Sequence, residues 1–208
     1  MGLDYSYEIF VPARNVARTL AALAELAPRT GRVPPLEVTL PGGVPLVVPF
    51  TSNFASEPVD CSAGGTLDLD TTIMFGVDDA VRAYVEGGGR APGPGPGPGP
   101  GPDGLGRAGI GYIYLTVRFA SAPHPRYAAL EFTAATSRMS VMFERSASVR
   151  TVFTGLAAAG GGACCVLDTE SDALQVCWLN GRTLRETVPG PRFPSLDDLA
   201  ATWPDQDP

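Results

Sequence analysis

The stretch from Pro92 to Pro102 alternates strictly between proline and glycine, and it limits the possible architecture more than any other part of the chain. Proline has no N–H for a helix or a strand ladder, and glycine has no side chain to bury. Together with its glycine-rich flanks, the run predicts a disordered, solvated segment over about residues 87–108. This segment is either a linker between two domains or a long loop within one.

The residues on both sides of the run favour a loop. Each side offers only a few predicted strands and one or two helices, which by themselves would leave sheet edges and apolar helix faces open. We therefore expect a single domain, residues 1–208, that the loop interrupts. Residues 1–86 and 107–208 should then be unable to fold separately.

The charged residues exclude several classes of function. All 15 basic residues are arginine, there is no lysine, and the chain has one histidine. This excludes lysine Schiff-base chemistry, a P-loop lysine and any site that needs two histidines. The absence of lysine also argues against the usual Lys/Arg nucleic-acid surface, and the net charge is −7. The apolar fraction of 44% is high enough for a folded, globular chain.

We expect a cytoplasmic protein with reduced cysteines and no membrane span. The N-terminus carries Asp4 and Glu8 where a signal peptide would need basic residues and an apolar run. The uncharged stretch of residues 151–167 is interrupted by four glycines and lies at the short limit for a transmembrane helix. Arginine without lysine, together with abundant alanine, glycine and proline, indicates a bacterial source with a GC-rich genome.

Hydrophobic periodicity predicts an α+β fold: a mainly antiparallel sheet of hairpins with helices packed on one face. Alternating apolar residues mark the strands, and Pro41-Gly42-Gly43 and Asn180-Gly181 mark hairpin turns. Asp78 and Ser195 are predicted helix N-caps. One long stripe of apolar residues at helical spacing is expected to be interrupted near residues 146–148. The predicted strands are 5–11, 36–40, 44–50, 67–75, 110–119, 127–133, 163–169, 173–179 and 183–188.

The hairpin formed by residues 163–179 has a register that can be predicted from the residues. With Glu170 and Ser171 at its tip, Cys164 pairs with Cys177. This register places Cys165, Leu167, Leu174, Val176 and Trp178 on one apolar face, and it assumes that only one face is buried. A one-residue slip would send that apolar set to opposite sides of the sheet.

The outer face of strand 110–119 is the first candidate binding surface. Ile110, Tyr112, Tyr114 and Arg118 share it, and Glu131 projects beside them from the neighbouring strand. Tyrosine and arginine are typical anchors of protein interfaces, because they bury a large area and keep a polar group. The alternative interpretation is that helices cover this face and the tyrosines only pack.

Other residue patterns point more weakly to chemistry. Asp68 and Asp70 resemble the Asp-x-Asp pair that holds a divalent ion, although they also fit the solvent-exposed face of a half-buried strand. Cys61 could be a reactive thiol, but no cation is near it in the sequence. The single histidine, His124, lies between two prolines in a predicted turn, and no C-x-x-C pair supports a zinc site. We therefore expect neither a resident metal nor a cofactor.

Two function hypotheses follow. The first is a non-enzymatic binding or interaction module, of a regulatory or toxin-neutralising type, that binds a basic protein partner through Tyr112, Tyr114, Arg118 and Glu131. The alternative is a carboxylate- or metal-dependent transferase or hydrolase that uses Asp68 and Asp70. A concave pocket that holds two or more carboxylates would favour the second hypothesis.

Overall fold

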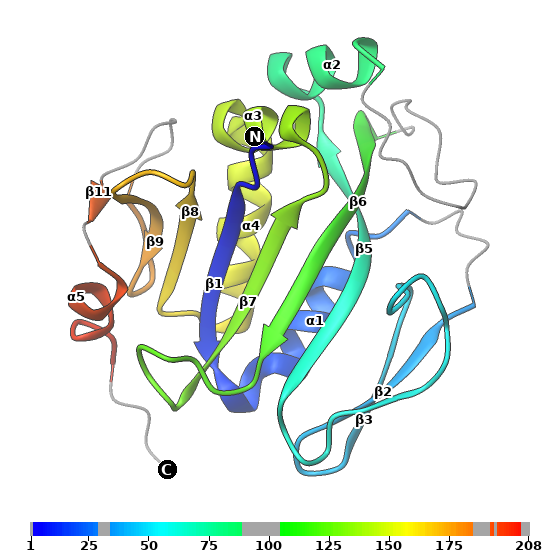
Figure 1. Ribbon diagram of the computed structural model, residues 1–208, viewed down its shortest axis with the longest axis vertical. Helices are drawn as coiled ribbons and strands as arrows, with labels where there is room; N and C mark the ends of the chain where they lie inside the picture. The colour runs from blue at the N-terminus through cyan, green and yellow to red at the C-terminus, as the bar shows by residue number, and fades with distance from the viewer. Residues whose placement is uncertain (1, 29–33, 89–104, 185–191, 194, 205–208) are drawn as a thin grey trace.

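We describe the fold from a computed structural model of the chain (Figure 1). It describes residues 2–28, 34–88, 105–184, 192–193 and 195–204. The Pro92–Pro102 run lies outside these residues.

The main sheet is antiparallel at every strand pair, as the hairpin pattern predicts, and the fold is α+β. Its strand order is β10-β9-β8-β1-β7-β6-β5, with β11 also paired to β9. The strands are β1 (Ser6–Pro12), β5 (Thr66–Gly76), β6 (Arg107–Arg118), β7 (Tyr127–Ala134), β8 (Cys164–Asp168), β9 (Leu174–Leu179), β10 (Arg182–Thr183) and β11 (Arg192–Phe193). The N-terminal strand β1 therefore lies between two strands that come after the Pro-Gly run.

A second, three-stranded sheet lies at one end of the molecule. It contains β2 (Leu36–Leu40), β3 (Val44–Val48) and β4 (Val59–Asp60) in the order β3-β2-β4. The predicted hairpin between β2 and β3 is confirmed, and β4 pairs with β2 in parallel.

Most of the helices follow a residue whose side chain accepts a hydrogen bond from a free backbone N–H group. The predicted N-caps Asp78 and Ser195 are confirmed, and the long stripe breaks at Ser146, which caps the second of its two helices. The helices are α1 (Val16–Ala24), α2 (Asp79–Glu86), α3 (Ser137–Arg145), α4 (Ala147–Gly160) and α5 (Leu196–Ala200). Within the described residues, no helix combines the length and the apolar character that crossing a membrane requires.

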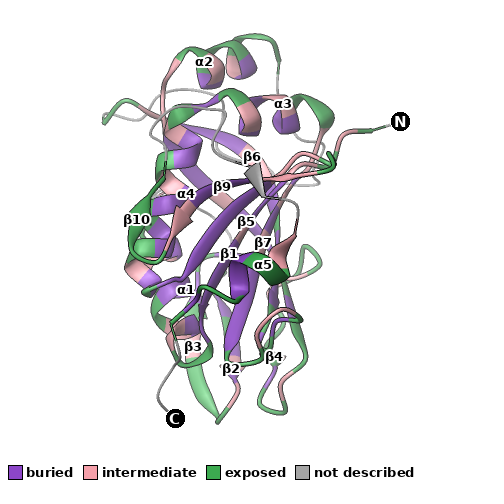
Figure 2. Cartoon of the chain, turned by 90° about the vertical axis from the view of Figure 1, so that its left-hand side faces the viewer, coloured by how far each residue is buried: buried purple, intermediate pink, exposed green. Residues whose placement is uncertain are grey.

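The main core lies between one face of the sheet and the helices α1 and α4, which stand behind the strands in Figure 1. Phe153 of α4 is fully buried at its centre. Its ring lies 4.4 Å from Tyr7 of β1 and 4.9 Å from Phe132 of β7, measured between ring centroids. The helix thus packs on the strands at the middle of the sheet, which Figure 2 shows as buried.

A smaller apolar cluster covers the opposite face at the β8–β9 end of the sheet. Trp203, which follows α5, packs on Phe10 of β1 with ring centroids 4.8 Å apart. Tyr127 of β7 donates a hydrogen bond from its hydroxyl to Pro204 O at 2.9 Å. The sheet is therefore buried on both faces at this end.

The predicted register of the β8–β9 hairpin is wrong. Cys164 pairs with Leu179 and Cys165 with Trp178, and the register shifts before Val166, which pairs with Val176. A β-bulge accounts for the shift, because Cys177 and Trp178 together oppose Cys165. Cys165 and Cys177 face the main core, whereas Cys164 faces the smaller cluster. The prediction assumed that one face of the hairpin is exposed to solvent. Both faces are buried in apolar clusters here, so burial alone does not select the register of β8 with β9.

Candidate functional site

The other face of the main sheet is not covered by any described helix where it spans β5, β6 and β7 (Figure 1). Side chains alternate between the two faces of a strand, so every second residue points to this side. Leu115 and Val117 point the other way, into the core. We call nine of these outward residues the open face: Glu8, Asp68, Asp70, Tyr112, Tyr114, Thr116, Arg118, Glu131 and Thr133.

The open face brings both sets of sequence candidates together. Tyr112, Tyr114 and Arg118 lie on β6, and Glu131 lies beside them on β7. Asp68 and Asp70 of β5 pair with Thr116 and Tyr114. The two function hypotheses therefore refer to neighbouring parts of one surface.

Ile110 does not belong to this surface, contrary to the sequence prediction. Its side chain is 1% exposed and packs in the main core. The pairing of β5 with β6 shifts between Thr72 and Met74, and Gly111 has a φ of 98°. Such a conformation is accessible to glycine at no steric cost. The irregularity at Gly111 turns Ile110 inward.

A row of acidic side chains crosses the open face. Glu8 of β1 lies opposite Glu131 of β7. On the next two strands, Thr116 of β6 lies opposite both Glu131 and Asp68 of β5. The Thr116 hydroxyl donates to Asp68 Oδ1 at 2.7 Å. Arg118 places Nη2 2.6 Å from Glu131 Oε2 and Nη1 3.6 Å from Glu8 Oε1. One guanidinium group thus bridges two carboxylates that face each other.

Glu8 holds its proton more tightly than an ordinary carboxyl group. Burial raises the pKa of Glu8 from 4.5 to about 7, and the carboxylates of Glu131 and Asp168 act in the same direction, whereas Arg118 lowers it. Burial penalises the charged form, and like charges close by penalise it further. Glu8 therefore changes its charge near neutral pH.

Asp70 organises the aromatic end of the open face. Its side chain is buried, and Oδ2 accepts hydrogen bonds from Phe54 N at 2.6 Å and from Thr51 Oγ1 at 3.1 Å. Asn53 and Phe54 have φ values of 49° and 59°, an uncommon backbone conformation for residues other than glycine. The Asp70 carboxylate thus holds a tight turn against β5.

This turn carries an aromatic side chain onto the two tyrosines. The Phe54 ring is 45% exposed and meets Tyr112 and Tyr114 edge-on, with ring centroids 5.5 and 6.5 Å apart. A pocket of about 250 Å³ lies beside it. The pocket is lined by Asn53, Phe54, Asp68, Leu69, Asp70, Tyr114, Leu115 and Thr116. Two carboxylates and two aromatic rings therefore share one concave site.

The remaining sequence candidates lie elsewhere. Cys61 is buried, and burial together with the charges of Asp60 and Asp68 raises the pKa of its thiol, which disfavours a reactive thiolate. The His124 ring packs against Tyr127 and Trp203. Among the residues that the structure describes, no three His, Cys, Asp or Glu side chains gather as a metal site would require.

Sequence reasoning missed Glu8 and Phe54. Glu8 reaches the open face only because β1 inserts between β7 and β8, a strand order that no local pattern reveals. Phe54 lies in a loop, and Asp70, distant in sequence, holds it in place. In the sequence, the one indication that Phe54 belongs to a site is that it is an isolated phenylalanine in a polar, turn-forming segment.

Comparisons with protein-family models, curated proteins and solved structures find no match for this chain.

Proposed function

We propose that the protein is a non-enzymatic binding module whose open face binds a basic protein partner. The observation that carries this proposal is the row of acidic residues from Glu8 to Asp68, of which Arg118 contacts Glu8 and Glu131. Opposite charge steers a partner to such a surface and rejects partners of the same charge. The net charge of −7 adds to this attraction.

The aromatic end of the open face would supply contact area. Phe54 and Tyr114 are 45% and 41% exposed, and Tyr112 is partly exposed beside them. Aromatic side chains bury much surface at low entropic cost and are enriched among the residues that dominate binding energy. In this proposal, a basic side chain of the partner pairs with Asp68 and Glu131 while an apolar one packs on Phe54.

A regulatory or toxin-neutralising role fits such a module. Both roles require a stable surface that recognises one partner without chemistry. The same proposal places the protein in the cytoplasm of a bacterium, because its cysteines are unpaired in the structure and its basic residues are all arginine. It also includes no nucleic-acid partner, since the open face is acidic.

A titration with a short arginine-rich peptide tests the charge argument. Asp68→Asn combined with Glu131→Gln should weaken binding at low salt by about tenfold or more, because charged hydrogen bonds are lost. The control is Glu25→Gln combined with Asp172→Asn, which changes the net charge equally at exposed residues away from the open face. If both double variants weaken binding equally, the attraction is non-specific and the proposal fails.

The alternative is a carboxylate- or metal-dependent transferase or hydrolase. The observation in its favour is that Asp68 and Asp70 line the same pocket of about 250 Å³. Calorimetry with magnesium, manganese and calcium separates the two functions. Millimolar binding that Asp68→Asn abolishes would favour the enzyme, whereas no binding of any of these ions would remove its metal-dependent form.

A further inference from the structure

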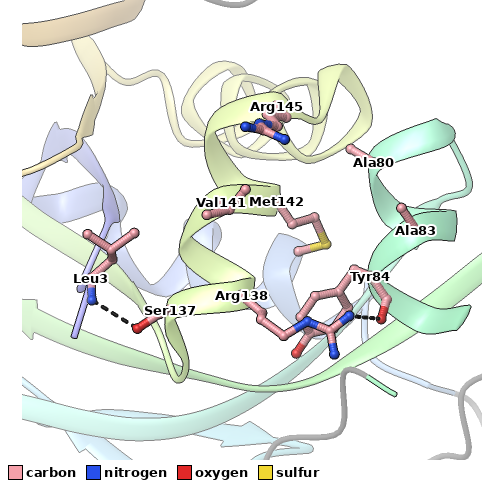
Figure 3. Close-up of a pocket in the computed structure, with 9 residues that line it drawn as sticks. All are labelled: Leu3, Ala80, Ala83, Tyr84, Ser137, Arg138, Val141, Met142 and Arg145. Carbon is pink, nitrogen blue, oxygen red and sulfur yellow. Dashed lines mark hydrogen bonds between the residues drawn. The ribbon is translucent and has the colours of Figure 1, made fainter. Parts of the chain in front are cut away.

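A second concave site lies between α2 and α3, away from the open face (Figure 3). This groove has a volume of about 400 Å³, within the range typical of small-molecule sites. It is lined by Leu3, Ala80, Ala83, Tyr84, Ser137, Arg138, Val141, Met142 and Arg145.

Hydrogen bonds hold the two helices in place at both ends of the groove. At one end, Asp78 Oδ2 accepts from Ser146 Oγ at 2.7 Å and from Ser148 N at 3.0 Å, and Oδ1 caps α2. At the other end, Arg138 donates to the carbonyl oxygens of Gly87 and Tyr84, and its guanidinium group lies 5.7 Å from the Tyr84 ring centroid. The groove is therefore already formed before any ligand binds.

Between these two ends, α2 presents side chains too small to fill the gap. Ala80 and Ala83 of α2 face Met142 of α3 across the groove, and Val141 lines the site from the side of α3 nearer Leu3 (Figure 3). Leu3 also lines the site, but from the side of α3 that lies away from α2 (Figure 3), where its N–H donates to Ser137 Oγ at 3.0 Å. The walls thus consist largely of methyl and methylene groups, and the Ser137 hydroxyl already has a partner.

Arg145 differs from the other polar residues of the groove. It is exposed at the end nearest Ala80 (Figure 3), and its side chain forms no hydrogen bond or ion pair with the described residues. Arg138, by contrast, is occupied with the end of α2. A guanidinium group pairs with a carboxylate through two parallel hydrogen bonds. The groove therefore combines an apolar interior with one available cation at its end.

We propose that this groove binds a small amphiphile, an aliphatic chain that ends in a carboxylate. The chain lies between α2 and α3, and the carboxylate pairs with Arg145. In a chain of net charge −7, an anionic ligand needs a local cation, and Arg145 provides one. This site is independent of the proposed function of the open face.

Dodecanoate below its critical micelle concentration is the probe, and backbone amide NMR of the full chain is the readout. We expect saturable shifts of the Ala80, Ala83 and Val141 amides. Dodecanol should bind more weakly, and dodecyltrimethylammonium should leave these amides unchanged. Equal responses to all three compounds, or no saturable shift in the groove, would overturn the proposal.

Two pairs of variants locate the ligand. Arg145→Ala should weaken binding of dodecanoate by about tenfold, whereas Arg82→Ala, an exposed arginine outside the groove, should leave it within twofold. Ala83→Phe should fill the groove and abolish binding, whereas Ala147→Phe, at an exposed position on α4, should not. All four positions are exposed, so the amide spectrum also reports that each variant is folded. Unchanged affinity in Arg145→Ala would show that no carboxylate pairs there.

Discussion

Glu8 on β1 and Glu131 on β7 lie directly opposite each other in the antiparallel register, and Arg118 contacts both carboxyl groups. Like charges in such a pair are destabilising unless one group is protonated or a cation lies between them. Here both conditions contribute. The arginine lies beside the pair, and the pKa of Glu8, raised to about 7 mainly by burial, keeps this group protonated in acid.

Stability should therefore fall as the pH rises through the range set by Glu8. Its pKa in the folded chain, about 7, is above the ordinary value of 4.5, so folding takes up a proton between these values. The stabilisation that comes from holding this proton on Glu8 is fully present below pH 4.5 and is lost as the pH rises to about 7. Glu8→Gln should remove this dependence and stabilise the protein at pH 8 by up to about 3 kcal/mol. Chemical denaturation across this pH range measures both effects.

The matched control for Glu8 is Glu37→Gln, on the exposed side of β2. It should leave the pH profile of stability unchanged. A Glu8→Gln variant with the profile of the unmodified chain would mean that Glu8 titrates normally.

Oxidation should join Cys165 to Cys177 and should not join Cys164 to Cys177. The bulge in β9 places Cys177 beside Cys165 on the side of α4, while Cys164 points to the opposite face. A hydrogen bond with Cys165 lowers the pKa of Cys177, although burial opposes this, and the charge of buried Arg150 lowers it further. Treatment with diamide followed by peptide mapping without reduction identifies the disulfide.

The single cysteine variants test this pairing. Cys164→Ser should still form the disulfide, and Cys165→Ser should not. A disulfide between Cys164 and Cys177 would instead support the register without the bulge.

Two glycines of α4 should respond to alanine in opposite ways. Gly155 is exposed with open space around it, so Gly155→Ala should stabilise the helix by about 0.5–1 kcal/mol. At Gly160 an added Cβ would collide with Thr19 Oγ1 of α1 and lie 2.9 Å from Val11 Cγ1 of β1. Gly160→Ala should therefore destabilise the protein by about 1–3 kcal/mol. Urea unfolding compares the two, and changes of the same sign would contradict this packing of α4 on α1.

The two halves of the chain should not fold apart. β1 is paired on one side with β7 and on the other with β8, so the N-terminal half alone lacks both partners of this strand. Expressed separately, residues 1–86 and 107–208 should be unfolded or aggregated, and mixing them should restore a cooperative melting transition. Circular dichroism on each half checks this. Two soluble halves that each melt cooperatively would establish two domains.

Local patterns were sufficient for most elements, because periodicity and capping are properties of neighbouring residues. Alternation in β6, the cap at Asp78 and the break at Ser146 all follow from residues within a few positions of each other. The grouping of Tyr112, Tyr114 and Arg118 on one face follows from the same period of two.

Other features depend on residues that are far apart in the sequence. The insertion of β1 between β7 and β8 places Glu8 opposite Glu131, and Asp70 draws the turn at Phe54 onto the tyrosines. The bulges at Gly111 and Cys177 reverse which side chains face the core, because one extra residue changes the parity of a strand. Whether a strand is buried on one face or on both is decided by what packs against it. The sequence therefore determines the elements and their alternation, whereas long-range packing determines the register and the composition of the site.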